Sequence, residues 1–175
     1  SSLGVGVFDE EVTFGIGEPT ETTLSTEPVR RGSFVVRHDA NGSLVWANRL
    51  ATWTQGPIRI TALDDGSHFV AGDFLESTTF GAGETGETTL HPSGDLDVFL
   101  ARYHADGTLD WVTRASITRP GGEDCNVTDS FVSGITHHAD GSPVVIGRFC
   151  GRATFGAGES GETTFHSRGM IDVFI

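Results

Sequence analysis

Three glycine-rich loops carry paired glutamates, and these are the residues that could bind a metal ion. Each loop reads Gly-x-Gly-Glu-x-x-Glu and occupies the same place in a repeated unit. The symmetry of the repeat would bring the loops to one rim as an acidic ring, which could hold Ca²⁺ through about six to eight oxygen ligands. The candidate ligands are Glu18, Glu21, Glu84, Glu87, Glu159 and Glu162, with Asp95, Asp97 and Asp172 as further candidates. Calcium is the one cofactor these residues suggest, and solvated acidic loops without metal are the alternative.

Both cysteines lie in the third copy of the unit, where the other copies have none. Cys125 and Cys150 flank a hairpin whose tip is Asp140-Gly141. Two cysteines at the base of one hairpin predict a disulfide, and two free buried thiols are the alternative. A disulfide would favour an oxidising, exported location.

No catalytic motif is present. The chain lacks a Gly-x-Ser-x-Gly elbow, a Walker loop and a His-Glu-x-x-His pair. We therefore expect a protein that is not an enzyme, with no catalytic residues. A hydrolase or lyase that gathers single residues from several repeats into a central funnel is the remaining enzymatic alternative.

The unit that positions these loops occurs about two and a half times. Phe14, Phe80 and Phe155 open the three loops, at spacings of 66 and 75 residues. Short runs of Val, Phe, Thr and Ile alternate with Gly, Asp and Asn, which is typical of strands joined by tight turns. In the second copy we expect strands at 58–63, 68–74, 98–104 and 109–115, and short β pieces at 78–80 and 88–90.

Four antiparallel strands per copy are typical of a β-propeller blade. One such sheet cannot cover both of its apolar faces, so neighbouring copies must do so. We predict an all-β protein of four-stranded antiparallel blades, a single repeat-built segment over 1–175. A partial blade spans 3–52, a complete blade 58–115 and a partial blade 129–175. We expect a segment of a longer chain, with the rest of the propeller supplied by that chain or by oligomerisation.

The second copy resembles a known repeat. Residues 97–111 read Asp-Val-Phe-Leu-Ala-Arg-Tyr-His-Ala-Asp-Gly-Thr-Leu-Asp-Trp, and residues 70–74 read Val-Ala-Gly-Asp-Phe. This pattern resembles the bacterial seven-bladed-β-propeller repeat (SBBP type), in which an Asp-x-Phe strand leads through an Asp-Gly turn to a Leu-x-Trp strand. The resemblance implies an exported or cell-surface bacterial protein and carries no shared catalytic residues. The Gly-x-Gly-Glu-x-x-Glu insertion lengthens the unit beyond the family's usual spacing.

The net charge of the chain limits the kinds of partner that it can bind. Formal net charge is −13, and all 11 basic residues are Arg. Such a surface repels nucleic acid and anionic lipid, so we expect neither as a partner. No stretch approaches the roughly 20 apolar residues of a membrane-spanning helix, so we expect no membrane insertion.

We therefore predict a non-catalytic interaction or scaffold module that is extracellular or on the bacterial cell surface, with protein or glycan partners. The alternative is a lectin-like, carbohydrate-binding propeller, with calcium assisting. That alternative requires exposed aromatic side chains, and Trp46 and Trp111 are the candidates. Their recurrence at one position of the unit favours packing between neighbours instead.

Overall fold

The computed structural model describes residues 1–26, 30–94, 96–118 and 130–175. This part of the chain is all-β, as predicted, and contains no helix that could span a membrane. The first unit contains β1 (Ser2–Asp9), β2 (Glu11–Phe14), β3 (Thr22–Ser25), β4 (Arg31–His38) and β5 (Leu44–Thr52). The second contains β6 (Arg59–Ala62), β7 (His68–Phe74), β8 (Thr78–Phe80), β9 (Thr88–Leu90), β10 (Leu96–Tyr103) and β11 (Leu109–Thr118). The third contains β12 (Phe131–His137), β13 (Pro143–Phe149), β14 (Arg152–Phe155), β15 (Thr163–His166) and β16 (Asp172–Phe174).

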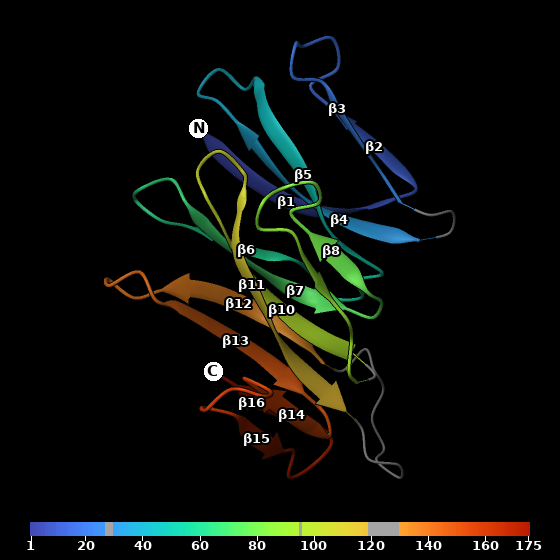
Figure 1. The fold of residues 1–175 in the computed structure, drawn as a ribbon, viewed down its shortest axis with the longest axis vertical. Helices are drawn as coiled ribbons and strands as arrows, with labels where there is room; N and C mark the ends of the chain where they lie inside the picture. The colour runs from blue at the N-terminus through green and yellow to red at the C-terminus, as the bar shows by residue number, and fades with distance from the viewer. Residues whose placement is uncertain (27–29, 95, 119–129) are drawn as a thin grey trace.

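The main strands of each unit form an antiparallel sheet, and the three sheets follow one another along the long axis of the molecule (Figure 1). The second unit has the order β6-β7-β10-β11, which is the four-stranded sheet that the sequence predicts. Sheets β1-β4-β5 and β12-β13-β16 have three strands each. None of the sheets of the described residues closes on itself.

The glycine-rich loops lie at the tips of the extra hairpins β2-β3, β8-β9 and β14-β15. Strand β14 pairs with β11 of the preceding unit, with Ala115 opposite Phe155, so that β14 and β15 together extend the second sheet to six strands. Hairpin β8-β9 likewise packs beside β5 of the first unit. A hairpin of one unit therefore covers the outer strand of the unit before it, which protects a sheet edge.

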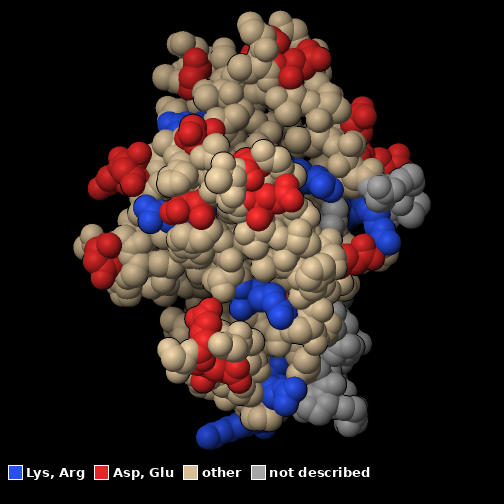
Figure 2. Space-filling view, in the orientation of Figure 1, with Lys and Arg blue, Asp and Glu red and all other residues tan. Residues whose placement is uncertain are grey.

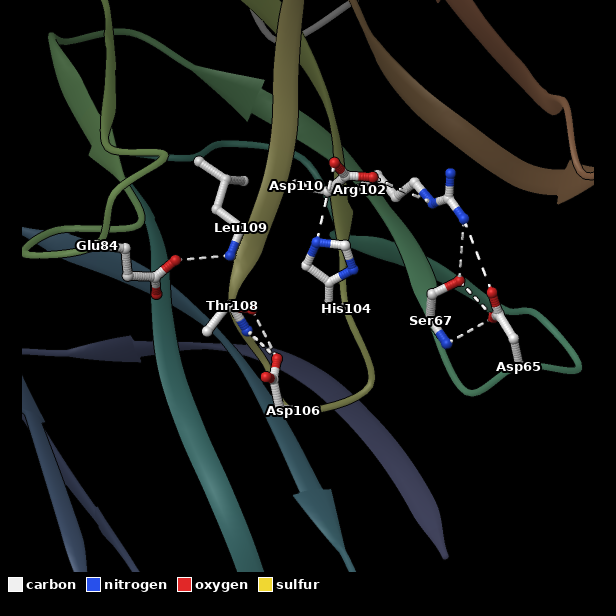
Figure 3. A network of polar contacts seen from close by, with 9 residues as sticks. All are labelled: Asp65, Ser67, Glu84, Arg102, His104, Asp106, Thr108, Leu109 and Asp110. Atoms are coloured by element: carbon white, nitrogen blue, oxygen red, sulfur yellow. Dashed lines mark hydrogen bonds and ion pairs between the residues drawn. The ribbon is translucent and has the colours of Figure 1, made fainter.

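The Asp-Gly turns form as predicted. In the turn between β10 and β11, Gly107 has a φ of 90°, which a side chain resists. The Asp106 carboxylate accepts hydrogen bonds from the hydroxyl and the backbone N–H of Thr108, and these bonds lower the pKa of Asp106 (Figure 3). Local hydrogen bonds therefore favour this turn.

Each boundary between units has its own apolar core. The larger core joins the first and second units and includes Val35, Leu50, Phe80 and Phe99. A second core joins the second and third units around Leu96 and other buried side chains. The recurring Phe residues therefore pack between sheets, as their repetition predicts.

Candidate functional site

In all three loops the second glutamate closes the loop on itself. Its carboxylate accepts a hydrogen bond from the backbone N–H of the second glycine. The pairs are Glu21 with Gly17 at 2.6 Å, Glu87 with Gly83 at 2.7 Å and Glu162 with Gly158 at 2.8 Å. These carboxylates hold the backbone of the loop, which is a structural role.

In two loops the first glutamate binds the start of the outer strand of its own unit. The Glu18 carboxylate accepts a hydrogen bond from the N–H of Leu44 at 2.7 Å. The Glu84 carboxylate accepts one from the N–H of Leu109 at 2.6 Å (Figure 3). In the first unit the Thr20 hydroxyl also donates to the carbonyl of Leu44, at 2.6 Å. The loop therefore binds the backbone of this leucine through hydrogen bonds.

The glycine that opens the loop lets the leucine come close. A Cβ added to Gly15 would lie 2.8 Å from the Cβ of Leu44, and one added to Gly81 would lie 2.9 Å from that of Leu109. Both glycines also have a positive φ, at 63° and 61°. The Gly-x-Gly-Glu-x-x-Glu pattern thus forms a loop that binds a leucine at the start of a strand.

We call the hydrogen bond from the leucine N–H to the first glutamate the clamp. It predicts different effects for the same substitution in two loops. Glu84→Ala leaves the N–H of buried Leu109 without its acceptor and should lower the free energy of unfolding by about 2 kcal/mol. Among the described residues, none donates a hydrogen bond to the Glu159 carboxylate, so Glu159→Ala should change it by less than about 0.5 kcal/mol. Urea denaturation of the two variants measures both values, and equal losses would contradict the clamp.

The aspartates proposed as calcium ligands have other partners. Asp97 is fully buried and accepts hydrogen bonds from the Ser93 N–H at 3.0 Å and from the Arg114 guanidinium. Asp172 accepts one from the Arg168 N–H at 2.7 Å. Asp95 lies outside the described residues.

The acidic loops are not gathered into a metal cage in the part of the chain that is described. No three His, Cys, Asp or Glu side chains of that part converge on one point. On the face in Figure 2, acidic side chains form several separate groups. Calcium binding stays a prediction. In the structure the carboxylates of Glu18 and Glu84 bind a leucine N–H, and the second glutamate of each loop binds the loop backbone.

The third unit has the loop and the aromatic pair of the other units, beside an open pocket. Its ring pair Phe155–Phe174 has a centroid distance of 5.3 Å, against 4.8 Å for Phe14–Phe34 and 5.0 Å for Phe80–Phe99. The pocket has a volume of about 490 Å³. Its walls include Leu100 and Ala115 of the second unit, with Phe155, Phe165, Phe174 and Glu159 of the third. Sequence reasoning missed this site.

The tryptophans proposed for sugar stacking take part in packing. Trp46 is half-buried, stacks on His68 at a centroid distance of 5.5 Å and donates a hydrogen bond to the Ala105 carbonyl at 3.3 Å. Trp111 is also half-buried, and its ring centroid lies 5.9 Å from that of Phe69. Both rings have neighbours from the protein itself, and carbohydrate binding stays a prediction.

The burial of two ionisable side chains could not be predicted from the sequence. His68 is fully buried, stacked between Trp46 and Tyr103, and burial with the nearby charge of Arg37 lowers its pKa to about 4. Asp73 accepts hydrogen bonds from two successive backbone N–H groups, at residues 55 and 56, both at 2.7 Å, and burial raises its pKa. Asp73 therefore holds the backbone segment that leads into β6.

The most visible polar network lies on the surface. The Arg102 guanidinium lies 3.8 Å from the Asp65 carboxylate and 3.6 Å from the Asp110 carboxylate, and His104 lies 3.9 Å from Asp110 (Figure 3). Exposed ion pairs of this kind contribute little to stability. Asp65 of this network also lines an open cavity of about 640 Å³, together with Arg37 and Asp64.

Cys150 is completely buried and follows the end of β13. Cys125 lies outside the described residues, so the Cys125–Cys150 disulfide stays a prediction.

Comparison of the chain with protein-family models, curated proteins and solved structures finds no match. The function proposed below therefore rests on the residues and the geometry of this chain.

Proposed function

We propose that this chain is a non-catalytic interaction module of an exported or cell-surface bacterial protein, and that its units are blades of a β-propeller. The four-stranded second sheet, the shared cores between units and the resemblance of residues 97–111 to a bacterial propeller repeat support the proposal. The proposed disulfide between Cys125 and Cys150 fits an exported location.

The open pocket of the third unit is the observation that carries the interaction function. Phe165, one of the apolar side chains that line it, is 50% exposed. Exposed apolar surface at a pocket is typical of sites of protein association. Glu18, Glu84 and Trp46, by contrast, already have partners in the protein itself. We therefore propose that a second copy of this chain binds at this pocket.

Substitution at the pocket should change association between copies. Sedimentation velocity from micromolar to hundreds of micromolar should show concentration-dependent association of the wild type. Phe165→Asp should weaken it by about tenfold or more, because burial of a Phe side chain contributes about 1.5–3 kcal/mol.

Ile16→Asp is the matched control, since Ile16 is 81% exposed in the loop of the first unit. It should associate as the wild type does. Identical sedimentation of wild type and Phe165→Asp across the range would overturn the proposed function.

A further inference from the structure

The turn between β4 and β5 contains an Asn-Gly pair, Asn41-Gly42, where the other hairpin turns of the main strands contain Asp-Gly. Those turns are Asp65-Gly66, Asp106-Gly107 and Asp140-Gly141. The Asn41 side chain is exposed. The Asp106 side chain is exposed as well, although its turn packs at Gly107 against Trp46 of the preceding unit. This position of the turn is therefore open to solvent even where a neighbouring unit covers the turn.

In the Asp-Gly turns the aspartate side chain closes the turn. The carboxylates of Asp65, Asp106 and Asp140 each accept hydrogen bonds from the hydroxyl and the backbone N–H of the residue two positions further on. These bonds lower the pKa of all three carboxyl groups, which are therefore ionised at neutral pH. An ionised carboxylate is a poor electrophile, because it has no group that leaves readily.

The side chain of Asn41 does not have this role. Asp39 takes it instead, since its carboxylate accepts hydrogen bonds from the backbone N–H groups of Asn41 at 2.7 Å and of Ser43 at 3.0 Å. The carboxamide of Asn41 is thus left out of the hydrogen bonds that close the turn. Its carbonyl carbon, Cγ, is an electrophile, and its nitrogen can leave as ammonia.

The backbone nitrogen of Gly42 is the nucleophile beside this carbon, and it is held more weakly than in the other three turns. The Gly42 N–H donates to the Asp39 carbonyl at 3.3 Å, whereas the equivalent distances for Gly66, Gly107 and Gly141 are 3.0, 3.0 and 2.9 Å. A distance of 3.3 Å lies outside the usual range of about 2.7–3.2 Å, so this hydrogen bond is easier to break. Glycine also has no side chain that would hinder ring closure.

We propose that Asn41 deamidates in the folded chain, by attack of the Gly42 backbone nitrogen on Asn41 Cγ. The N–Cγ bond forms as the Gly42 nitrogen loses its proton, and the Asn41 amide nitrogen leaves with a proton as ammonia. A cyclic imide results. Water then opens the ring, giving aspartate if the new N–Cγ bond breaks, or isoaspartate if the original peptide bond to Gly42 breaks. The net reaction consumes one water and releases one ammonia, with no oxidant or reductant.

Conversion to aspartate gives this turn the residue of the other three. The new carboxylate takes the position from which Asp106 accepts the hydrogen bonds of Thr108, and Ser43 offers the same two donors, a hydroxyl and an N–H. It also adds a negative charge to a chain whose net charge is −13. The site lies in the first unit, so the inference goes beyond the association proposed for the third.

Peptide mapping of the folded chain after incubation near pH 8 tests the inference. Cleavage after arginine releases residues 38–49, which contain both Asn41 and Asn48. Fragmentation in the mass spectrometer should locate a gain of about 1 Da at Asn41. Conversion should be at least about tenfold faster than at Asn48, whose amide nitrogen must first leave its 2.7 Å hydrogen bond to the Gly107 carbonyl. Its rate should rise with pH, because base removes the proton of the attacking nitrogen.

Asn41→Gln is the matched control, because its longer side chain would have to close a larger ring, and it should show no gain in mass at this position. Asn41→Asp supplies the retention time of the aspartate product. The wild-type chain in urea gives the rate without the turn. An Asn41 that stays unconverted in the folded chain while it converts in urea would contradict the inference, and so would conversion at Asn41 no faster than at Asn48.

Discussion

Asp97→Ala is expected to lower the free energy of unfolding by about 3 kcal/mol, at the lower end of the range for breaking a buried ion pair. The Asp97 carboxylate has no exposed surface, and it holds both the Arg114 guanidinium of β11 and the Ser93 N–H. Arg114 keeps some access to solvent, with 29% of its side chain exposed, which limits the cost. Urea denaturation followed by tryptophan fluorescence measures the change.

Asp172→Ala is the matched control, at the same position of the third unit. Asp172 accepts one hydrogen bond, from the Arg168 N–H, and lies in a part-exposed setting. Its loss should cost about 1 kcal/mol or less. An equal cost for the two variants would mean that the Asp97–Arg114 pair contributes no more than the loop hydrogen bond.

Acidification from pH 6.5 to pH 4 is expected to remove up to about 3 kcal/mol of stability through His68. Burial, with a smaller effect of the Arg37 charge, lowers the pKa of His68 from 6.5 to about 4. Between these values the unfolded chain binds a proton that the folded chain does not. Stability from this group is therefore complete above pH 6.5 and falls as the pH drops through the window.

His68→Phe is the control, because it keeps a ring between Trp46 and Tyr103 and cannot be protonated. The difference in unfolding free energy between wild type and variant should grow as pH falls from 6.5 to 4. Asp73 acts in the opposite direction, since its pKa is raised, but it is common to both proteins. A difference that does not change with pH would show that His68 is protonated as easily in the folded state as in the unfolded one.

Much of the local structure could be predicted from the residues. Strands β8 and β9 lie where the sequence predicts short β pieces, because Thr-Thr-Phe and Thr-Thr-Leu are β-favouring runs bounded by glycine or other turn formers. The turn at Gly107 follows from the Asp-Gly pair. The repetition of Phe at one position predicted packing between units, and Phe80 and Phe99 lie in such a core.

The roles of the polar side chains could not be predicted in this way. Glu18 and Glu84 looked like metal ligands, whereas their partners are Leu44 and Leu109, 26 and 25 residues further along the chain. His68 follows a turn, and it is buried because Trp46 of the first unit and Tyr103 of β10 stack on its two faces.

Sequence by itself determined the β class, the turns and the repeat, because backbone geometry and strand preference depend on neighbouring residues. Only the tertiary structure decided what the Gly-x-Gly-Glu-x-x-Glu loops do and that the third unit has an open pocket. Hydrogen bonds to a strand more than 20 residues away, and the pairing of β14 with β11 across a unit boundary, depend on how the sheets stack. That stacking is set by the burial of side chains from two units at once, which no single stretch of sequence contains.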